Sequence, residues 1–380
     1  MTRLFNDFFK NEKSPGFVLF FSAVISMLLA NFGSRPGYVD FWQIEFGSLS
    51  VTEWINDGLM TVFFLSVGLE LKQELRVGNL SNRSDAMMPV VAALGGMLIP
   101  AGLHLLMNKG TISQAGAGIP MATDIAFSLA VLSILGNRVP VSLKVFLTAL
   151  AVIDDLGAII VIATFYTSTI NWVYLAMSLS LFGILFLLNR FKVLSMLVYC
   201  VGGVVMWYLM MQSGIHPTIS GVLLAFAIPF REDETRSPSH RILRFLHLPV
   251  AFIILPLFAL ANTCIVFPDQ WTNGLFDWNS IGIMSGLVIG KPFGIFLFCY
   301  GSAFFGLTQL RKDLNWTQII GAGCLAGIGF TMSIFITLLA FHDQRLVDQS
   351  KIAIIVSSAT AIFIGSIVLS FSARRIKKAV

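Results

Sequence analysis

Apolar runs of about twenty residues recur along the whole of this 380-residue chain, and they constrain its fold more than any other feature. A helix needs about twenty mainly apolar residues to cross the hydrocarbon core of a bilayer. Hydrophobic residues make up 56% of the sequence and charged residues 12%. That charged fraction is about half of the roughly 25% found in soluble proteins. The sequence therefore predicts an all-α integral membrane protein.

Charged or turn-rich breaks divide the apolar runs into twelve candidate transmembrane helices. These spans are expected at residues 15–33, 54–76, 87–107, 116–136, 141–167, 173–189, 194–211, 215–230, 249–267, 281–303, 318–341 and 352–373. The loop between the first two spans, residues 37–53, is different. Apolar and polar residues alternate there between Ile44 and Val51 around Gly47 and Ser48, a pattern typical of a small β-hairpin.

The distribution of Lys and Arg predicts the orientation, because cytoplasmic loops of membrane proteins are enriched in both. With the N-terminus in the cytoplasm and sides alternating, 20 of the 25 Lys and Arg residues fall in cytoplasmic segments and four outside, while Lys291 lies within a span. Both termini are thus expected in the cytoplasm. In the cytoplasmic segment 1–14, apolar residues at helical spacing favour a short helix along the membrane surface. Basic residues spread over seven segments exclude nucleic acid as a partner.

Cofactor chemistry has no signature in this sequence. The four cysteines are scattered in apolar runs without metal-binding spacing, as expected of small buried residues: Cys200, Cys264, Cys299 and Cys324. No Walker motif, GxGxxG motif or His/Cys metal site is present. We therefore expect no cofactor and no enzymatic activity.

Four ionisable residues fall near the middle of predicted spans, where lipid makes charge costly. They are Asp124, Asp154, Asp155 and Lys291. Each costs about 2.5–3.5 kcal/mol on insertion scales, so the set costs roughly 10–14 kcal/mol. One Asp–Lys pair would recover part of this cost without explaining three carboxylates against a single ammonium group.

Asp154 and Asp155 are adjacent in the sequence, so their side chains point in different directions on a helix. Neighbouring helical residues point about 100° apart, so one of Asp154 and Asp155 can line a cavity while the other meets a partner. Lys291 is the one cationic candidate at that depth. Carboxylate oxygens are ligands for hard cations such as Na⁺ or Li⁺. A carboxylate that binds either a proton or a cation, but never both, would exchange one for the other.

Two predicted spans carry helix-breaking residues at the same depth. Span four reads Gly118-Ile119-Pro120-Met121-Ala122-Thr123-Asp124, and span eleven reads Gly327-Ile328-Gly329-Phe330-Thr331-Met332-Ser333. Glycine can also serve close helix packing, but broken helices expose carbonyls and helix ends for ion binding. Spans three to five begin inside and spans ten to twelve outside. Residues 87–167 and 281–373 are therefore expected to form inverted repeats within one transporter domain, 1–380.

An ordered set of motifs resembles the NhaA family of bacterial sodium/proton antiporters. The set runs from the second span to the eleventh in the family's order. It comprises Trp54-Ile55-Asn56-Asp57, Val62-Phe63-Phe64 to Gly68-Leu69-Glu70, Ala122-Thr123-Asp124-Ile125-Ala126-Phe127, Ile153-Asp154-Asp155-Leu156-Gly157-Ala158, Gly290-Lys291-Pro292 and Gly327-Ile328-Gly329-Phe330-Thr331-Met332-Ser333. The resemblance covers essentially the whole chain, and the set is far more specific than any single motif.

The resemblance implies a role for each buried polar residue. Asp155 would be the principal cation ligand and proton carrier, with Asp154 beside it and able to pair with Lys291. Thr123 would lie close to this site. Where spans four and eleven cross at mid-membrane, Asp124 would offset the positive ends of the half-helices and Lys291 the negative ones.

Charged residues at the end of span two have two readings. Glu70, Lys72, Glu74 and Arg76 could form an ordinary solvated helix end or the mouth of a funnel. The resemblance places Glu70 and Glu74 at a cytoplasmic mouth linked to the response to pH. It also implies that the hairpin between Ile44 and Val51 mediates contact in a homodimer.

One departure from the family lies before span nine. The family has a glutamate followed by a histidine in its pH-responsive stretch, and the corresponding residues here are Leu243 and Arg244. Of that cluster only His247 persists. The resemblance therefore does not extend the family's activation by alkaline pH to this chain.

The predicted function is electrogenic antiport in a bacterial inner membrane, with Na⁺ and Li⁺ exported for external H⁺ by alternating access. A cation channel or a proton-coupled carrier of another solute could use the same carboxylates. An intramembrane aspartyl protease also needs two aspartates at mid-membrane. Such enzymes use a Gly-x-Gly-Asp motif, however, whereas Gly327-Ile328-Gly329 is followed by Phe330.

Overall fold

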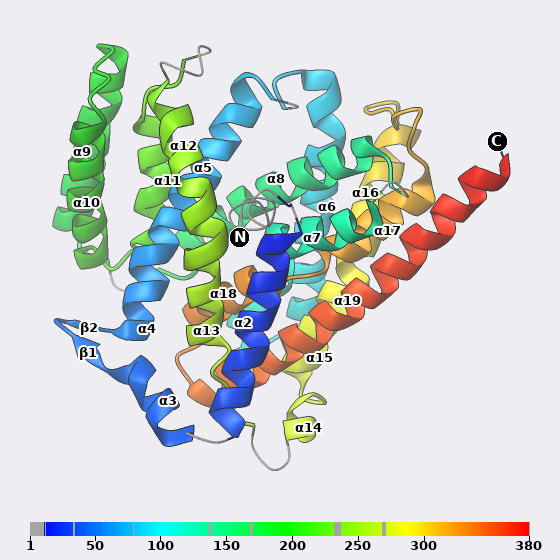
Figure 1. Cartoon of the computed structure of the whole chain (residues 1–380), viewed down its shortest axis with the longest axis horizontal. Coiled ribbons are helices and arrows are strands. Elements are labelled where there is room, and N and C mark those ends of the chain that lie inside the picture. Colours follow the sequence, from blue (N-terminus) through cyan, green and yellow to red (C-terminus); the bar gives the residue numbers. More distant parts are fainter. Residues whose placement is uncertain are drawn as a thin grey trace, which may run out of the picture. The chain divides into compact units, whose positions relative to one another are not determined.

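The structure of this chain is a computed structural model, and helices make up most of it (Figure 1). It describes residues 11, 13–32, 35–78, 80–136, 139–167, 170–231, 237–267 and 271–379. The helix expected within residues 1–14 lies largely outside this part. The chain forms two compact units: unit 1 comprises Met1–Phe21, Asn82–Ala158 and Ile265–Val380, and unit 2 comprises Ser22–Ser81 and Ile159–Cys264.

Unit 1 is entirely helical where it is described. Its elements are α6 (Arg83–Asn108), the 3-10 helix η2 (Ile112–Met121), α7 (Ile125–Leu135), α14 (Trp271–Gly274), α15 (Trp278–Ser285), the π-helix η5 (Gly286–Gly290), α16 (Lys291–Phe304), α17 (Trp316–Ala326), α18 (Phe330–Ala340) and α19 (Gln344–Ala379). Two further helices, α2 (Ser14–Asn31) and α8 (Val141–Phe165), continue from unit 1 into unit 2.

Unit 2 combines helices with one small hairpin. Its elements are α3 (Arg35–Gln43), β1 (Glu45–Phe46), β2 (Leu49–Ser50), α4 (Val51–Glu53), the π-helix η1 (Trp54–Leu59), α5 (Met60–Arg76), α9 (Trp172–Arg190), α10 (Met196–Gln212), α11 (Thr218–Ala227), α12 (Pro238–Pro249), the π-helix η4 (Val250–Ile254) and α13 (Leu255–Asn262).

Within the described residues, eight helical stretches are long and apolar enough to cross a membrane. Two more candidates are bent pairs: η2 with α7, at 40°, and α17 with α18, at 48°. Helices α10 and α11 are apolar but have only 17 and 10 residues, about 25 and 15 Å against a core of about 30 Å. The chain is therefore a multi-pass membrane protein with the two expected breaks, and the count of twelve spans stays a prediction.

Some expected boundaries were wrong. The ninth span was expected to begin at residue 249, but its helix begins at Pro238, where proline occupies the first turn. The apolar-run criterion missed residues 238–248 because this stretch carries polar residues along one face. The last helix likewise begins at Gln344 rather than 352, and α3 was not expected at all.

The β-hairpin expected between Ile44 and Val51 is confirmed. Strands β1 and β2 are antiparallel, with Glu45 opposite Ser50 and Phe46 opposite Leu49. Gly47 in the turn has φ +75°, a left-handed conformation that favours glycine. Ser50 then caps α4 through a reciprocal pair of hydrogen bonds with Glu53, so the hairpin leads directly into the second span.

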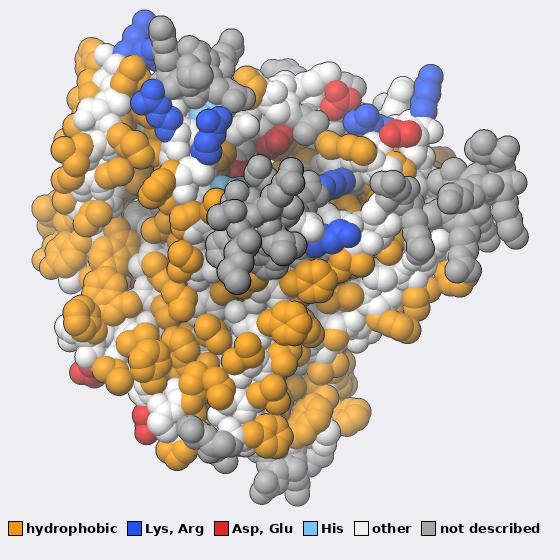
Figure 2. Space-filling view, in the orientation of Figure 1, with side chains coloured by type: hydrophobic (Ala, Val, Ile, Leu, Met, Phe, Trp, Pro, Cys, Tyr) orange, Lys and Arg blue, Asp and Glu red, His pale blue; other side chains and the backbone are white. Residues whose placement is uncertain are grey.

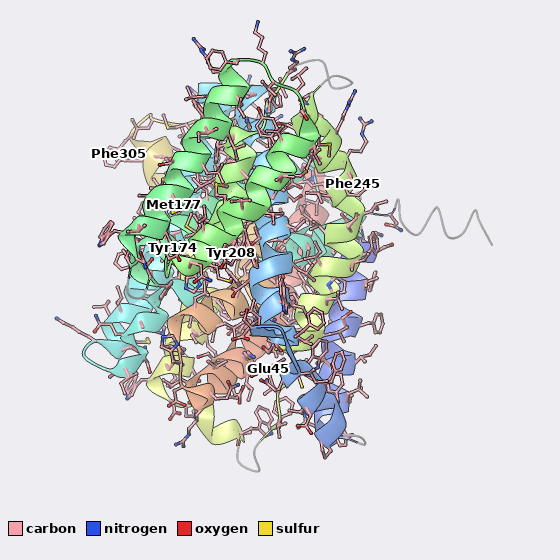
Figure 3. All side chains as sticks on the ribbon, turned by 90° about the vertical axis from the view of Figure 1, so that its left-hand side faces the viewer. Glu45, Tyr174, Met177, Tyr208, Phe245 and Phe305 are labelled. Carbon is pink, nitrogen blue, oxygen red and sulfur yellow. The ribbon has the colours of Figure 1, made fainter. Side chains whose placement is uncertain are left out.

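The outer faces of unit 2 are suited to lipid. Figure 2 shows mainly hydrophobic side chains along α9, α10, α12 and α13, with Lys and Arg gathered at the end where α9 finishes and α12 begins. Tyr174 and Met177 of α9, Tyr208 of α10 and Phe245 of α12 project outward (Figure 3). Exposed aromatic and apolar side chains of this kind are expected where lipid replaces water as the solvent.

In unit 1, α6 and α16 cross with their backbones in contact. A Cβ atom added at Gly95 would collide with the carbonyl oxygen of Gly294, and one at Gly294 would collide with that of Gly95. Glycine at both positions allows this approach. The π-helix η5 ends one residue before Lys291, and such irregular turns are frequent at functional sites. The crossing thus places the start of α16 in the middle of unit 1.

Candidate functional site

The two helix breaks of unit 1 lie side by side. Helix η2 ends at Met121, and the backbone is extended at Ala122 and Asp124 before α7 begins. The second break lies between the end of α17 and the start of α18. The amide of Asp124 donates a 2.6 Å hydrogen bond to the carbonyl oxygen of Ile328. The two breaks therefore meet through their backbones, and four helix ends converge on one point.

Asp124 satisfies the N-terminal ends of both α7 and α18. Its Oδ1 accepts a hydrogen bond from the amide of Phe127 in α7 at 3.0 Å. Its Oδ2 accepts from the amide of Thr331 at 3.1 Å and from the Thr331 hydroxyl at 2.6 Å. The N-terminus of a helix carries partial positive charge and free amides. One buried carboxylate therefore accepts hydrogen bonds at two helix ends, and the charge-balancing role that the resemblance implies for Asp124 stays a prediction.

The C-terminal ends of the other two half-helices receive donors. Lys291 donates from Nζ to the carbonyl oxygen of Met121, at the end of η2. The hydroxyl of Thr123 donates to the carbonyl oxygen of Ala326, at the end of α17, at 2.9 Å. Carbonyls at a helix C-terminus lack partners within the helix and carry partial negative charge. Lys291 thus lies at a helix end that carries partial negative charge, and the charge-balancing role that the resemblance implies for it stays a prediction.

Two serines to which the sequence analysis gave no role complete the crossing. Ser128 of α7 donates to the carbonyl oxygen of Leu325 in α17 at 2.8 Å, and Ser333 of α18 donates to that of Ile119 in η2 at 2.7 Å. Each helix that follows a break therefore supports the half-helix before the opposite break. Serine is common in membrane helices, but its position one turn after each break is a signal that could have identified both residues.

Asp154 and Lys291 form the central ion pair. The distance from Nζ of Lys291 to Oδ2 of Asp154 is 2.5 Å, and neither side chain is exposed. The same Oδ2 lies 2.6 Å from the hydroxyl oxygen of Thr123, whose single hydrogen is shared between Asp154 and the carbonyl oxygen of Ala326. Within the described residues, Oδ1 of Asp154 accepts no hydrogen bond although it is buried. One oxygen of this carboxylate is therefore occupied by two donors, and the other keeps its acceptor capacity.

Asp155 follows Asp154 on α8 and is equally buried, at 1% exposure. It interacts electrostatically with Lys291. Unit 1 thus buries the carboxylates of Asp124, Asp154 and Asp155 with the ammonium group of Lys291. Oδ1 of Asp154 is an oxygen of the kind that can bind a proton or a small hard cation.

The predicted cytoplasmic-mouth residues lie in unit 2. Glu70 and Glu74 are partly buried on α5, and His247 is exposed on α12, which packs against α5. Lys72 differs from the expectation of a solvated helix end, since it is buried and donates hydrogen bonds to backbone carbonyls at the C-terminal end of α11. The funnel mouth stays a prediction.

Two broken helices that meet around buried, paired charges define a class of protein, the ion-coupled secondary transporters. The comparison with known proteins agrees and is more specific. The sequence model of the Na⁺/H⁺ antiporter 1 family matches residues 6–369, and this chain belongs to that family.

Relatives of the chain match over nearly their whole length. It is 56% identical to an NhaA Na⁺/H⁺ antiporter of Flavobacterium johnsoniae over 371 residues, which cover 98% of this chain and 97% of that relative. It is 54% identical to the NhaA antiporter of Flavobacterium psychrophilum, with the same shares covered. With the NhaA antiporter of Cytophaga hutchinsonii the identity is 53% over 365 residues, or 96% and 94% of the two chains.

Proposed function

We propose that this chain is a sodium/proton antiporter that exports Na⁺ in exchange for external H⁺. The observation that carries the proposal is the buried pair of Asp154 and Lys291, with Asp155 beside it, at the meeting point of two helix breaks. Family membership and the names of the relatives support the same activity. Paired intramembrane charges are expensive and mark ion pathways.

Asp155 and Asp154 would bind the cation, and the protons that it displaces would leave to water. Thr123 holds one oxygen of Asp154 and the end of α17 together, so it would position the carboxylate. Asp124 and Lys291 would balance the helix ends around the site. Na⁺ would compete with the Lys291 ammonium for Asp154, and Lys291 would keep its contact with the carbonyl of Met121. If one Na⁺ displaces more than one proton, net charge moves and the membrane potential contributes to export.

The exchange would proceed by alternating access between two inverted repeats, 87–167 and 281–373. Each repeat has its bent pair in the middle, which supports this division. We further propose that Li⁺ is carried like Na⁺, that both termini face the cytoplasm of a bacterial cell, and that the hairpin of β1 and β2 contributes to a homodimer. The asymmetric distribution of Lys and Arg supports the orientation.

Proton movement in acidified everted vesicles tests the antiport. The vesicles come from a bacterial host that lacks its own antiporters, and Na⁺, Li⁺, K⁺ or choline is added at several pH values. We expect Na⁺ and Li⁺ to dissipate the proton gradient, and we expect Asp155→Asn to abolish this effect. Asp313→Asn is the matched control, because Asp313 is an exposed carboxylate in the loop between α16 and α17.

The alternatives give different results in the same vesicles. Correctly inserted protein with no Na⁺ response at any pH would refute antiport and favour a proton-coupled carrier of another solute. Full activity of Asp155→Asn would refute the assigned site. Exchange whose rate does not respond to an imposed K⁺ diffusion potential would refute electrogenic transport and leave neutral exchange in its place.

A further inference from the structure

A buried lysine near the end of α5 is bound by a neighbouring helix of unit 2. Lys72 is 8% exposed, an unusual position for a lysine that forms no ion pair within the described residues. Its Nζ donates to three backbone carbonyl oxygens, those of Ala225 at 3.1 Å, Phe226 at 2.9 Å and Ile228 at 2.5 Å. Helix α11 ends at Ala227. These oxygens therefore belong to the C-terminal end of α11.

This contact satisfies both the carbonyl oxygens at the end of α11 and the ammonium group of Lys72. The last carbonyls of a helix have no partners within it and carry partial negative charge, which a cation stabilises. An ammonium group has three N–H donors and no acceptor. Three carbonyl oxygens around Lys72 therefore use its full donor capacity, and they form a small cation site made only of backbone. Ala227 and Ile228 at this end of α11 are buried, so the carbonyl oxygens there need a donor from within the protein.

Helix α5 approaches α11 closely along the face of α5 that ends at Lys72. A Cβ atom added at Gly68 would collide with the side chain of Ala225, and one at Gly221 would collide with the carbonyl oxygen of Thr61. Residues 61, 68 and 72 share one face of α5, since they are separated by seven and four positions. The backbones are therefore in contact along this face, and the ammonium group closes its end.

The opposite face of α5 carries the two glutamates. Glu70 and Glu74 are four residues apart, so they share a face, and they interact electrostatically. Lys72 lies two residues from each of them, about 200° around the helix. Contact between Lys72 and α11 therefore sets the rotation at which α5 presents both carboxylates on its other side.

We propose that the end of α11 is a site for a primary ammonium ion, that Lys72 fills it from within the chain, and that this contact positions Glu70 and Glu74. Lys72 is a positioning residue, since it touches backbone and not the transported ion. The effect on the glutamates rests on the proposed antiport, whereas the ammonium site does not. Removal of the lysine head group leaves a vacated site that a free alkylammonium ion can enter.

Thermal unfolding of the purified full-length protein tests the ammonium site without any transport measurement. We expect Lys72→Ala to lower Tm by roughly 5–10 °C, because three buried carbonyls lose their donors. Ethylammonium should restore much of this loss, whereas tetramethylammonium at equal ionic strength should not, since it has no N–H group. Lys72→Arg should stay near the wild-type Tm. Arg76→Met is the matched control, because Arg76 is an exposed cation on the same helix.

Two results would overturn the ammonium site. One is a Lys72→Ala variant that responds equally to ethylammonium and tetramethylammonium. The other is a Lys72→Met variant with the wild-type Tm, and this comparison remains decisive if Lys72→Ala cannot be purified.

Na⁺ kinetics in proteoliposomes test the positioning of the glutamates. We expect Lys72→Met to raise the KM for Na⁺ several-fold with little change in kcat, and Lys72→Arg to restore it. An unchanged KM in a destabilised Lys72→Met would overturn the positioning role. Wild-type protein that exchanges no Na⁺ would instead refute the proposed antiport, and the thermal test would still decide the ammonium site.

Discussion

Replacement of Asp124 by alanine tests whether one carboxylate holds two helix ends together. Asp124 accepts three hydrogen bonds, one from Phe127 of α7 and two from Thr331 of α18. A helix cap contributes about 1 kcal/mol, and a hydrogen bond to a charged group about 1.5–3 kcal/mol. The three bonds share one acceptor group and are not independent. We therefore expect Asp124→Ala to lower the free energy of unfolding by about 3–5 kcal/mol.

The measurement is equilibrium unfolding of the purified protein in mixed micelles as the fraction of denaturing detergent rises. Asn315→Ala is the matched control, because Asn315 caps the single helix α17 through its own pair of reciprocal hydrogen bonds. We expect that control to cost about 1 kcal/mol. A loss in Asp124→Ala no larger than in Asn315→Ala would refute the double cap.

A second variant measures the contribution of the α18 end alone. Thr331→Val removes only the 2.6 Å bond between the hydroxyl and Asp124. In the wild-type background it should cost about 1.5–3 kcal/mol, and in the Asp124→Ala background much less. Equal costs in both backgrounds would mean that the two residues are not energetically coupled.

Three further predictions concern unit 1 and use the same unfolding measurement. Gly95→Ala should lower the free energy of unfolding by at least about 2 kcal/mol, because its Cβ would meet a backbone carbonyl of α16. Gly102→Ala, on the open side of α6, should be neutral or stabilising. Similar effects of the two substitutions would refute the close crossing of α6 and α16. Ser333→Ala should cost about 1–3 kcal/mol, since a buried carbonyl of η2 loses its donor, and no change would mean that another donor replaces it. Lys291→Met should lower the free energy of unfolding by about 3–5 kcal/mol, because it leaves the Asp154 carboxylate without its partner. Adding Asp154→Asn should recover part of that loss. A further loss of stability in the double variant would contradict the pairing.

The sequence was most informative where lipid constrains it. Apolar runs located the spans because backbone in a bilayer must form helices. The breaks before Ile125 and Phe330 were predictable because Gly, Pro and Thr gathered at mid-span. The convergence of Asp154 and Lys291 followed from charge, because a buried carboxylate needs a partner and the chain offers one lysine at that depth.

The sequence was least informative where helix faces and helix ends decide the structure. The solvated helix end that was one expectation for Lys72 is not found, because this side chain is buried and donates hydrogen bonds to the last carbonyls of α11. This contact joins residues about 150 positions apart. No local pattern reveals it. The acceptors of Ser128 and Ser333 also lie on the opposite half-helix, and the one local signal for these serines is their position one turn after each break. Helix α12 began earlier than expected because amphipathic turns do not form an apolar run.

The double cap on Asp124 also bears on the order of synthesis. Asp124 and its partner Thr331 are 207 residues apart in the chain. While the ribosome makes the intervening spans, the start of α7 is already in the membrane, and its carboxylate lacks the second set of donors. The crossing is therefore completed only late in translation. N-terminal fragments that stop before α18 should be substrates for membrane quality control, even when every span in them has inserted.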